Sequence, residues 1–217
     1  MTKILVVEGD ADREFYSAIC ERAGVKNVEV KTPSSKGKYN AIDLFGLLLK
    51  QLPSGSIKHI GLVVDADHPE SVGGASGFGA TYAKISGVAA NAGFQAPPIN
   101  PKAPIAYLLT PPQGLQAPGV WIMPDNSSHG MVEDFVKHGV TDPAQKSILE
   151  QAVKTVASLK NPLFKPALHK SKVDVYTWLA WQKNPGSRLV GTVGNELIDL
   201  SNPLQAGFVS WLKKVFP

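Results

Sequence analysis

Three acidic side chains follow two apolar segments of the sequence and are suited to binding a divalent cation. Glu8 closes the segment KILVVE, Asp65 closes the segment HIGLVVD, and Asp67 stands two residues later. Carboxylates that lie close together repel one another, which raises their pKa unless a cation lies between them. Because oxygen-only ligands suit Mg²⁺ or Mn²⁺ better than zinc, these acids predict a site for one of those two ions.

The elements around these acids explain why they should meet. We expect buried strands at residues 3–8, 28–32 and 59–65, with amphipathic helices at 10–24 and 40–52 between them. This alternation predicts an α/β fold with a parallel, doubly wound sheet, because crossovers between parallel strands are right-handed. Ligands of such sheets bind just outside the carboxyl ends of the strands. The three carboxylates should therefore share one edge of the sheet.

The rest of the chain is expected to complete the sheet and then to form helices. Short strands are predicted near residues 105–109 and 120–123, and helices near 82–91, 133–136, 145–159, 171–183 and 204–216. A Gly- and Ser-rich segment at 68–81 is predicted to be a loop beside the acids. Residues 1–140 should thus form the sheet-containing domain, with residues 141–217 as a helical C-terminal extension packed on the same core.

The composition is that of a globular protein without a membrane anchor. Hydrophobic residues make up 43% of the 217 residues, which is enough for a sizeable core. No apolar run approaches the roughly 20 residues that cross a bilayer. The N-terminal segment lacks the features of a signal peptide, and the single cysteine, Cys20, excludes an intrachain disulfide framework. We therefore expect a cytoplasmic protein that does not contact membranes.

A mild positive charge is compatible with nucleic acid as a partner. The net charge is +4, and several lysines cluster in the C-terminal half: Lys154, Lys160, Lys165, Lys170 and Lys172. They form either a solvated face or a surface that follows phosphates, and composition does not choose between the two. Trp178 and Trp181 are interpreted as core packing rather than as platforms for base stacking.

A Glu at the end of the first strand, followed later by Asp-x-Asp at the end of another, resembles the Toprim domain. Toprim domains occur in primases, topoisomerases, ribonuclease-maturation enzymes and OLD (overcoming lysogenization defect) nucleases. The sequence is most similar to the OLD-like branch, in which an Asp follows the first Glu by four positions, as Asp12 follows Glu8 here. The phrases WIMPDN, EDF and TWLAWQ also resemble a stand-alone Toprim-like bacterial family of uncharacterised function.

The resemblance implies a set of site residues on a Rossmann-like sheet. Its metal ligands would be Glu8, Asp12, Asp65, Asp67 and Glu133, and its catalytic residues Glu8, Asp65, Asp67 and Lys172. Two choices stay open. Asp134 competes with Glu133, since neighbours on a helix point about 100° apart and only one should face the metal. Lys170 competes in the same way with Lys172.

The activity implied is hydrolysis of nucleic-acid phosphodiesters with Mg²⁺ or Mn²⁺ as cofactor, on DNA rather than RNA, in defence against foreign DNA. OLD nucleases join their Toprim domain to an ATPase, but no GxxxxGK[ST] motif occurs in this sequence. An ATPase would therefore have to be a separate partner protein. The segments that primases and topoisomerases need beyond the Toprim domain are not recognisable here.

Two other functions fit parts of the pattern. A Toprim-like module without catalysis would bind nucleic acid or a protein without cutting. A receiver domain would use Glu8 and Asp10 as its acid pair and Asp65 as phosphoacceptor. A receiver should also carry a lysine before the proline that follows its last strand, whereas GVWIMPDN has Pro124 without a lysine.

Overall fold

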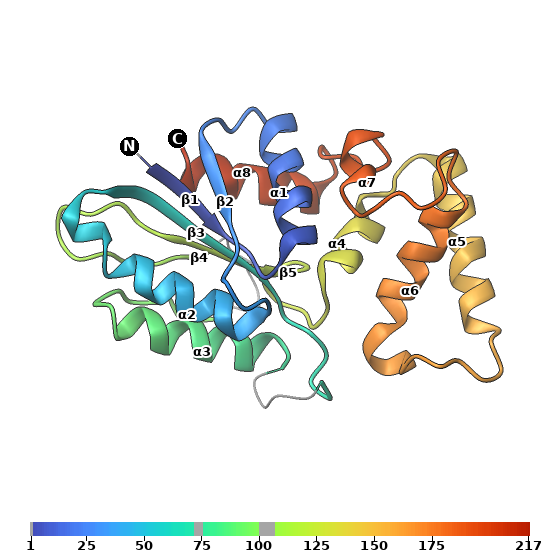
Figure 1. Cartoon of the computed structure of the whole chain (residues 1–217), viewed down its shortest axis with the longest axis horizontal. Coiled ribbons are helices and arrows are strands. Elements are labelled where there is room, and N and C mark those ends of the chain that lie inside the picture. The colour runs from blue at the N-terminus through green and yellow to red at the C-terminus, as the bar shows by residue number, and fades with distance from the viewer. Residues whose placement is uncertain (1, 72–75, 100–106) are drawn as a thin grey trace.

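A five-stranded sheet forms the centre of the molecule (Figure 1). The computed structural model describes residues 2–71, 76–99 and 107–217. The strands are β1 (Thr2–Val6), β2 (Val28–Lys31), β3 (Ile57–Asp65), β4 (Tyr107–Leu108) and β5 (Gly119–Met123), in the order β2-β1-β3-β5-β4. β1 lies between β2 and β3 and is parallel to both, so the predicted α/β fold with its parallel core is confirmed.

The expectation of a parallel sheet is wrong at one edge. β5 is parallel to β3, but β4 pairs with β5 in the antiparallel direction. A parallel pair needs a crossover of a dozen or more residues, usually a helix. Only residues 109–118 join β4 to β5, and they form a turn instead of a helix. The predicted strand at 105–109 and the predicted loop at 68–81 both lie partly outside the described residues. The loop prediction is wrong for residues 78–81, which begin a helix.

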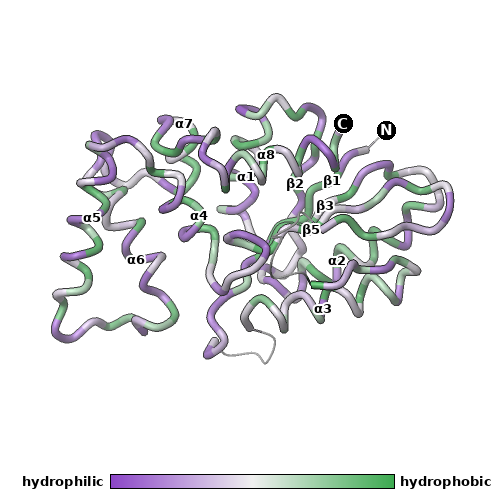
Figure 2. The backbone as a smooth tube through the Cα atoms, turned by 180° about the vertical axis from the view of Figure 1, so that it is seen from behind, coloured by the Kyte–Doolittle hydropathy of each residue, from purple (hydrophilic) through white to green (hydrophobic). Residues whose placement is uncertain are grey.

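Helices cover both faces of the sheet. On one face lie α2 (Lys38–Leu49) and α3 (Phe78–Ala90), and on the other α1 (Asp10–Arg22) and α8 (Pro203–Val215). Successive strand residues point to opposite faces, so Ile4 and Val6 belong to the core under α2 and α3. Leu5 and Val7 belong to the core under α1 and α8. Figure 2 shows the hydrophobic character concentrated along the central strands.

The C-terminal part is helical, as predicted. The extension predicted at 141–217 contains α5 (Pro143–Ala157), α6 (Pro166–Ala180), the short α7 (Gly191–Gly194) and α8. α4 (Val132–Gly139) directly precedes it, and a 3₁₀ turn, η1 (Leu52–Ser54), precedes β3. α5 and α6 form a hairpin that projects from one end of the molecule (Figures 1 and 2). No described helix has the length and apolar character needed to span a membrane.

Trp178 lies in α6 and Trp181 directly follows it, and the two side chains differ in burial. Trp178 is fully buried and shares one hydrophobic cluster with Phe135 and Trp211, so its predicted core role is confirmed. Trp181 is 42% exposed, so the same prediction is wrong for it. Trp178 ties the hairpin to the core around the sheet. The division of the chain at residue 140 stays a prediction.

Candidate metal centre

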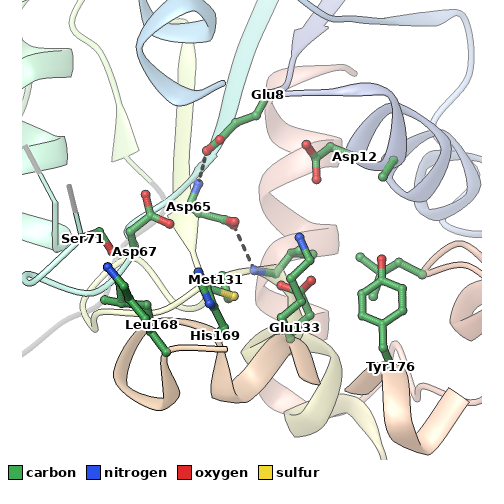
Figure 3. A pocket seen from close by; sticks show the side chains of 15 residues that line it. Glu8, Asp12, Asp65, Asp67, Ser71, Met131, Glu133, Leu168, His169 and Tyr176 are labelled. Carbon is green, nitrogen blue, oxygen red and sulfur yellow. Dashed lines mark hydrogen bonds between the residues drawn. The ribbon is translucent and has the colours of Figure 1, made fainter. Parts of the chain in front are cut away.

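Five acidic side chains line one cavity of about 540 Å³ outside the carboxyl ends of the central strands. They are the predicted ligands Glu8, Asp12, Asp65, Asp67 and Glu133. Figure 3 shows them reaching the cavity from separate elements. Glu8 follows β1, Asp12 is in the first turn of α1, Asp65 ends β3, and Glu133 is in the first turn of α4. The structure thus brings together acids that are far apart in the sequence.

The Asp65 carboxylate and backbone join three elements of this cavity. The Asp65 N–H donates a hydrogen bond of 2.8 Å to Glu8 Oε1. Asp65 Oδ1 accepts a 2.9 Å hydrogen bond from the N–H of Val132, the first residue of α4. The N-terminus of a helix favours a nearby negative charge. β1, β3 and α4 are therefore fixed relative to one another through groups that belong to the site.

Asp67 is positioned by its backbone and by a buried lysine. Its φ of +60° lies in the left-handed region, and its N–H donates a 2.7 Å hydrogen bond to Gly130 O. Lys38, only 6% exposed, places its Nζ 2.6 Å from Asp67 Oδ2 and 3.1 Å from Ala66 O. Sequence reasoning missed Lys38. Its signal was weak, because a lysine near the start of an amphipathic helix is ordinary.

The geometry distinguishes Glu133 from Asp134. Glu133 is 4% exposed and lines the cavity. Asp134 Oδ2 accepts a 3.1 Å hydrogen bond from the Met131 N–H, and its Oδ1 lies 3.1 Å from Lys137 Nζ. Ser171 on α6 also donates a hydrogen bond to Asp134. Asp134 is therefore engaged in holding α4 against α6, and Glu133 is the acid that faces the site.

The same comparison separates Lys172 from Lys170. Lys172 lines the cavity, whereas Lys170 lies 2.7 Å from the buried carboxylate of Asp174. The positive charge of Lys172 lowers the pKa of both Asp12 and Glu133, against the stronger upward effect of burial. Lys172 is therefore the lysine whose charge acts on the acidic cavity.

Burial and mutual repulsion oppose ionisation of these acids. The pKa of Glu8 is raised from 4.5 to about 8, chiefly by burial and further by the negative charges of Asp12 and Asp67. Burial also raises the pKa of Asp65 well above its ordinary value, with further contributions from Glu8 and Glu133. A bound divalent cation would reverse both effects. Because all the ligand atoms of these acids are oxygens, the set fits a hard cation such as Mg²⁺ or Mn²⁺.

The acids surround the cavity without converging on one point. Within the described residues, no three His, Cys, Asp or Glu side chains form a ready group of metal ligands. The Asp67 carboxylate is held by Lys38, and Glu8 Oε1 is held by the Asp65 N–H. Glu8 and Asp67 thus both have protein partners in this structure.

One family model matches residues 2–217, and its description is "Protein of unknown function (DUF3226)". The chain belongs to the DUF3226 family. No curated protein and no solved structure matches it. Since the DUF3226 description gives no activity, the function has to be argued from the cavity.

The DUF3226 chain also contributes α6 residues to the cavity that sequence reasoning missed as site residues. These are Lys165, Leu168, His169 and Tyr176. Lys165 is the N-cap of α6, and His169 and Tyr176 follow it at intervals of four and seven residues. This spacing was visible in the sequence, but which face of α6 meets the sheet edge was not. The fold departs from that of a receiver, whose strand order is 2-1-3-4-5. Here the last two strands are exchanged and β4 is antiparallel.

Proposed function

We propose that this protein is a divalent-metal-dependent nuclease that hydrolyses phosphodiester bonds of nucleic acid. One observation carries the proposal: five carboxylates from four segments of the chain line the cavity that Lys172 also lines. Such a site has acidic groups for metal ions and a cation for the phosphate. The +4 net charge agrees with a polyanionic substrate.

The residues of the cavity have distinct tasks in this proposal. Glu8, Asp12, Asp65, Asp67 and Glu133 would hold Mg²⁺ or Mn²⁺. When bound, these ions supply an activated water and stabilise the leaving oxygen of a phosphodiester. Lys172 binds the non-bridging phosphate oxygens and offsets the negative charge that grows there during attack. Lys38 positions Asp67 through their 2.6 Å ion pair.

The resemblance to Toprim domains supports the same chemistry. The pattern of Glu8, Asp12 and Asp65-Ala66-Asp67 resembles that of the OLD-like branch, and Glu8 and Asp65 stand at the ends of parallel strands. By this resemblance, the substrate is DNA rather than RNA and the role is defence against foreign DNA. The same resemblance makes an ATPase a candidate partner.

A second candidate function is a Toprim-like module that binds nucleic acid or a protein without cutting. The observation that favours it is that two of the carboxylates already have protein partners: Lys38 pairs with Asp67, and the Asp65 N–H donates to Glu8. Metal-independent binding of nucleic acid without turnover would support this module over the nuclease.

A nuclease assay separates the two candidates. Supercoiled, linear and single-stranded DNA, together with RNA, would be incubated with Mg²⁺ or Mn²⁺ and either wild type, Asp65→Asn or Glu8→Gln. Both substitutions keep the oxygen that accepts the observed hydrogen bond. Metal-dependent cutting that both variants lose supports the nuclease. Cutting that survives both substitutions, or no cutting with either metal, contradicts it.

A further inference from the structure

A second depression lies beside the acidic cavity and shares two of its residues. This shallow groove, of about 540 Å³, is lined by Lys172, Val173, Tyr176, Thr177 and Ala180 of α6. Lys172 and Tyr176 also line the acidic cavity. The two depressions are therefore neighbours along α6, and Lys172 and Tyr176 stand at their boundary.

The exposed side chains of α6 form a stripe that leads to this boundary. Lys165, His169, Lys172 and Tyr176 follow one another at spacings of four, three and four residues, which places them on one face of the helix. Among the residues that the structure describes, neither Lys165 nor Lys172 has an ion-pair partner. Both lysines are exposed and available to phosphates.

Tyr176 presents an aromatic ring at the edge of a groove that is otherwise mostly apolar. The residue is 37% exposed, and Figure 3 shows its ring standing up from α6 at the side of the cavity. The groove beyond it is lined by Val173, Thr177 and Ala180. A flat apolar surface next to a lysine matches a nucleotide, which has a flat base next to a phosphate.

We propose that this groove binds an unpaired base next to the scissile phosphate, with Tyr176 as the stacking platform and Lys172 and Lys165 along the phosphates. The inference rests on the proposed nuclease function and names its substrate class as single-stranded nucleic acid. A base inside a duplex is covered on both faces by its neighbours, so it can contact Tyr176 only after unstacking. Single strands, by contrast, present their bases at no such cost.

Binding assays test this inference separately from cleavage. Fluorescence anisotropy would follow a labelled single-stranded DNA 12-mer, a duplex of the same sequence and inorganic polyphosphate, each bound by an Asp65→Asn parent that does not cut. Tyr176→Ala and Tyr176→Phe would be added to this parent. Trp181→Ala is the matched control, because Trp181 follows the same helix and is 42% exposed but lines neither depression.

Tyr176→Ala should weaken single-strand binding roughly 5- to 100-fold, the range found for one stacked base. Tyr176→Phe and Trp181→Ala should change it less than about twofold, and duplex and polyphosphate binding should stay unchanged. An equal loss for all three ligands, no loss at all, or no binding of single strands by the parent would overturn the inference. Circular dichroism of each variant checks that it is folded.

The two proposals can fail independently. If Tyr176→Ala has the expected effect but wild type cuts no substrate, the groove is a single-strand site on a module without nuclease activity. If wild type cuts in an Asp65-dependent way but Tyr176→Ala leaves single-strand binding unchanged, the nuclease proposal stands and the base site is wrong.

Discussion

The N–H of Asp65 donates a 2.8 Å hydrogen bond to Oε1 of Glu8, across 57 positions of sequence. The bond joins the ends of the neighbouring parallel strands β1 and β3, where the polypeptide leaves the sheet after each strand. Both partners carry acidic side chains with strongly raised pKa values. The hydrogen bond itself lowers the pKa of Glu8, but burial outweighs it and opposes ionisation of both acids. Binding of a metal ion to these acids would therefore release protons.

Replacement of Glu8 by Gln should change the dependence of stability on pH. The folded protein keeps the Glu8 proton up to a pKa of about 8, whereas the unfolded chain loses it near 4.5. The stability that Glu8 contributes is thus fully present below the lower value and is lost as pH rises through the higher one. Glu8→Gln does not titrate, so without metal it should become more stable than wild type above pH 8.

Thermal unfolding in metal-free buffer measures this difference. We expect the gap in Tm between Glu8→Gln and wild type to widen by at least about 2–4 °C across the pH range, or ~1 kcal/mol for a chain of this size. Added Mg²⁺ or Mn²⁺ should close the gap by stabilising wild type alone. A gap that is independent of both pH and metal would contradict the coupling.

Loss of the buried Lys38 charge should destabilise the fold through Asp67. Lys38→Met leaves the Asp67 carboxylate without its 2.6 Å partner. Because Asp67 keeps some exposure, we expect the free energy of unfolding to fall by about 1–3 kcal/mol, which is less than the loss of a fully buried pair would cost. Urea unfolding measures this free energy. The double variant Lys38→Met/Asp67→Asn should recover part of the lost stability. Lys84→Met, which removes an exposed pair at 3.9 Å, should change stability by less than about 1 kcal/mol.

Substitutions of Glu133 and Asp134 should have opposite effects on metal affinity and on stability. Glu133→Gln should lower metal affinity, read by calorimetric titration with Mn²⁺, and leave the free energy of unfolding equal or higher. Asp134→Asn weakens the contacts with Met131 and Lys137, and should reduce stability by ~1–2 kcal/mol with little change in metal affinity. The reverse pattern would place Asp134 in the site.

Lys172 and Lys170 give a second matched pair. Lys172→Met should lower kcat by about 10²-fold with a smaller change in KM, because its charge is needed most as the phosphate becomes more negative. Lys170→Met removes the pair with the buried Asp174 and should mainly lower Tm. Steady-state kinetics and thermal unfolding of both variants distinguish the roles. Equal kinetic losses would contradict this assignment.

Much of the fold was predictable because it depends on local patterns. The apolar segments that end at Glu8 and Asp65 are buried strands, and a parallel pairing alone is enough to place their acids at one edge. The antiparallel β4 was not predictable, since strand direction depends on how the chain returns after a turn. The choice of Glu133 over Asp134 needed the angle at which α4 meets the cavity.

No local sequence pattern predicted that α6 lines the cavity. The lysines and Tyr176 repeat at helical spacing. This spacing places them on one face of a helix, but it does not show what that face contacts until the packing of the helix is known. That packing depends on Trp178, which is fully buried between the hairpin and the core. Trp181, only three residues later, lies just beyond the last residue of α6 and is 42% exposed.

The rate of metal-dependent phosphodiester hydrolysis in two matched acid variants tests the nuclease proposal most directly. Asp65→Asn alters an acid of the cavity, whereas Asp10→Asn alters a nearby acid that lies outside it and pairs with Lys36 at 2.6 Å. With Mn²⁺ and single-stranded DNA, we predict cutting by wild type and by Asp10→Asn, and a loss of at least about 10²-fold in folded Asp65→Asn. Equal rates for the two variants would contradict the proposal.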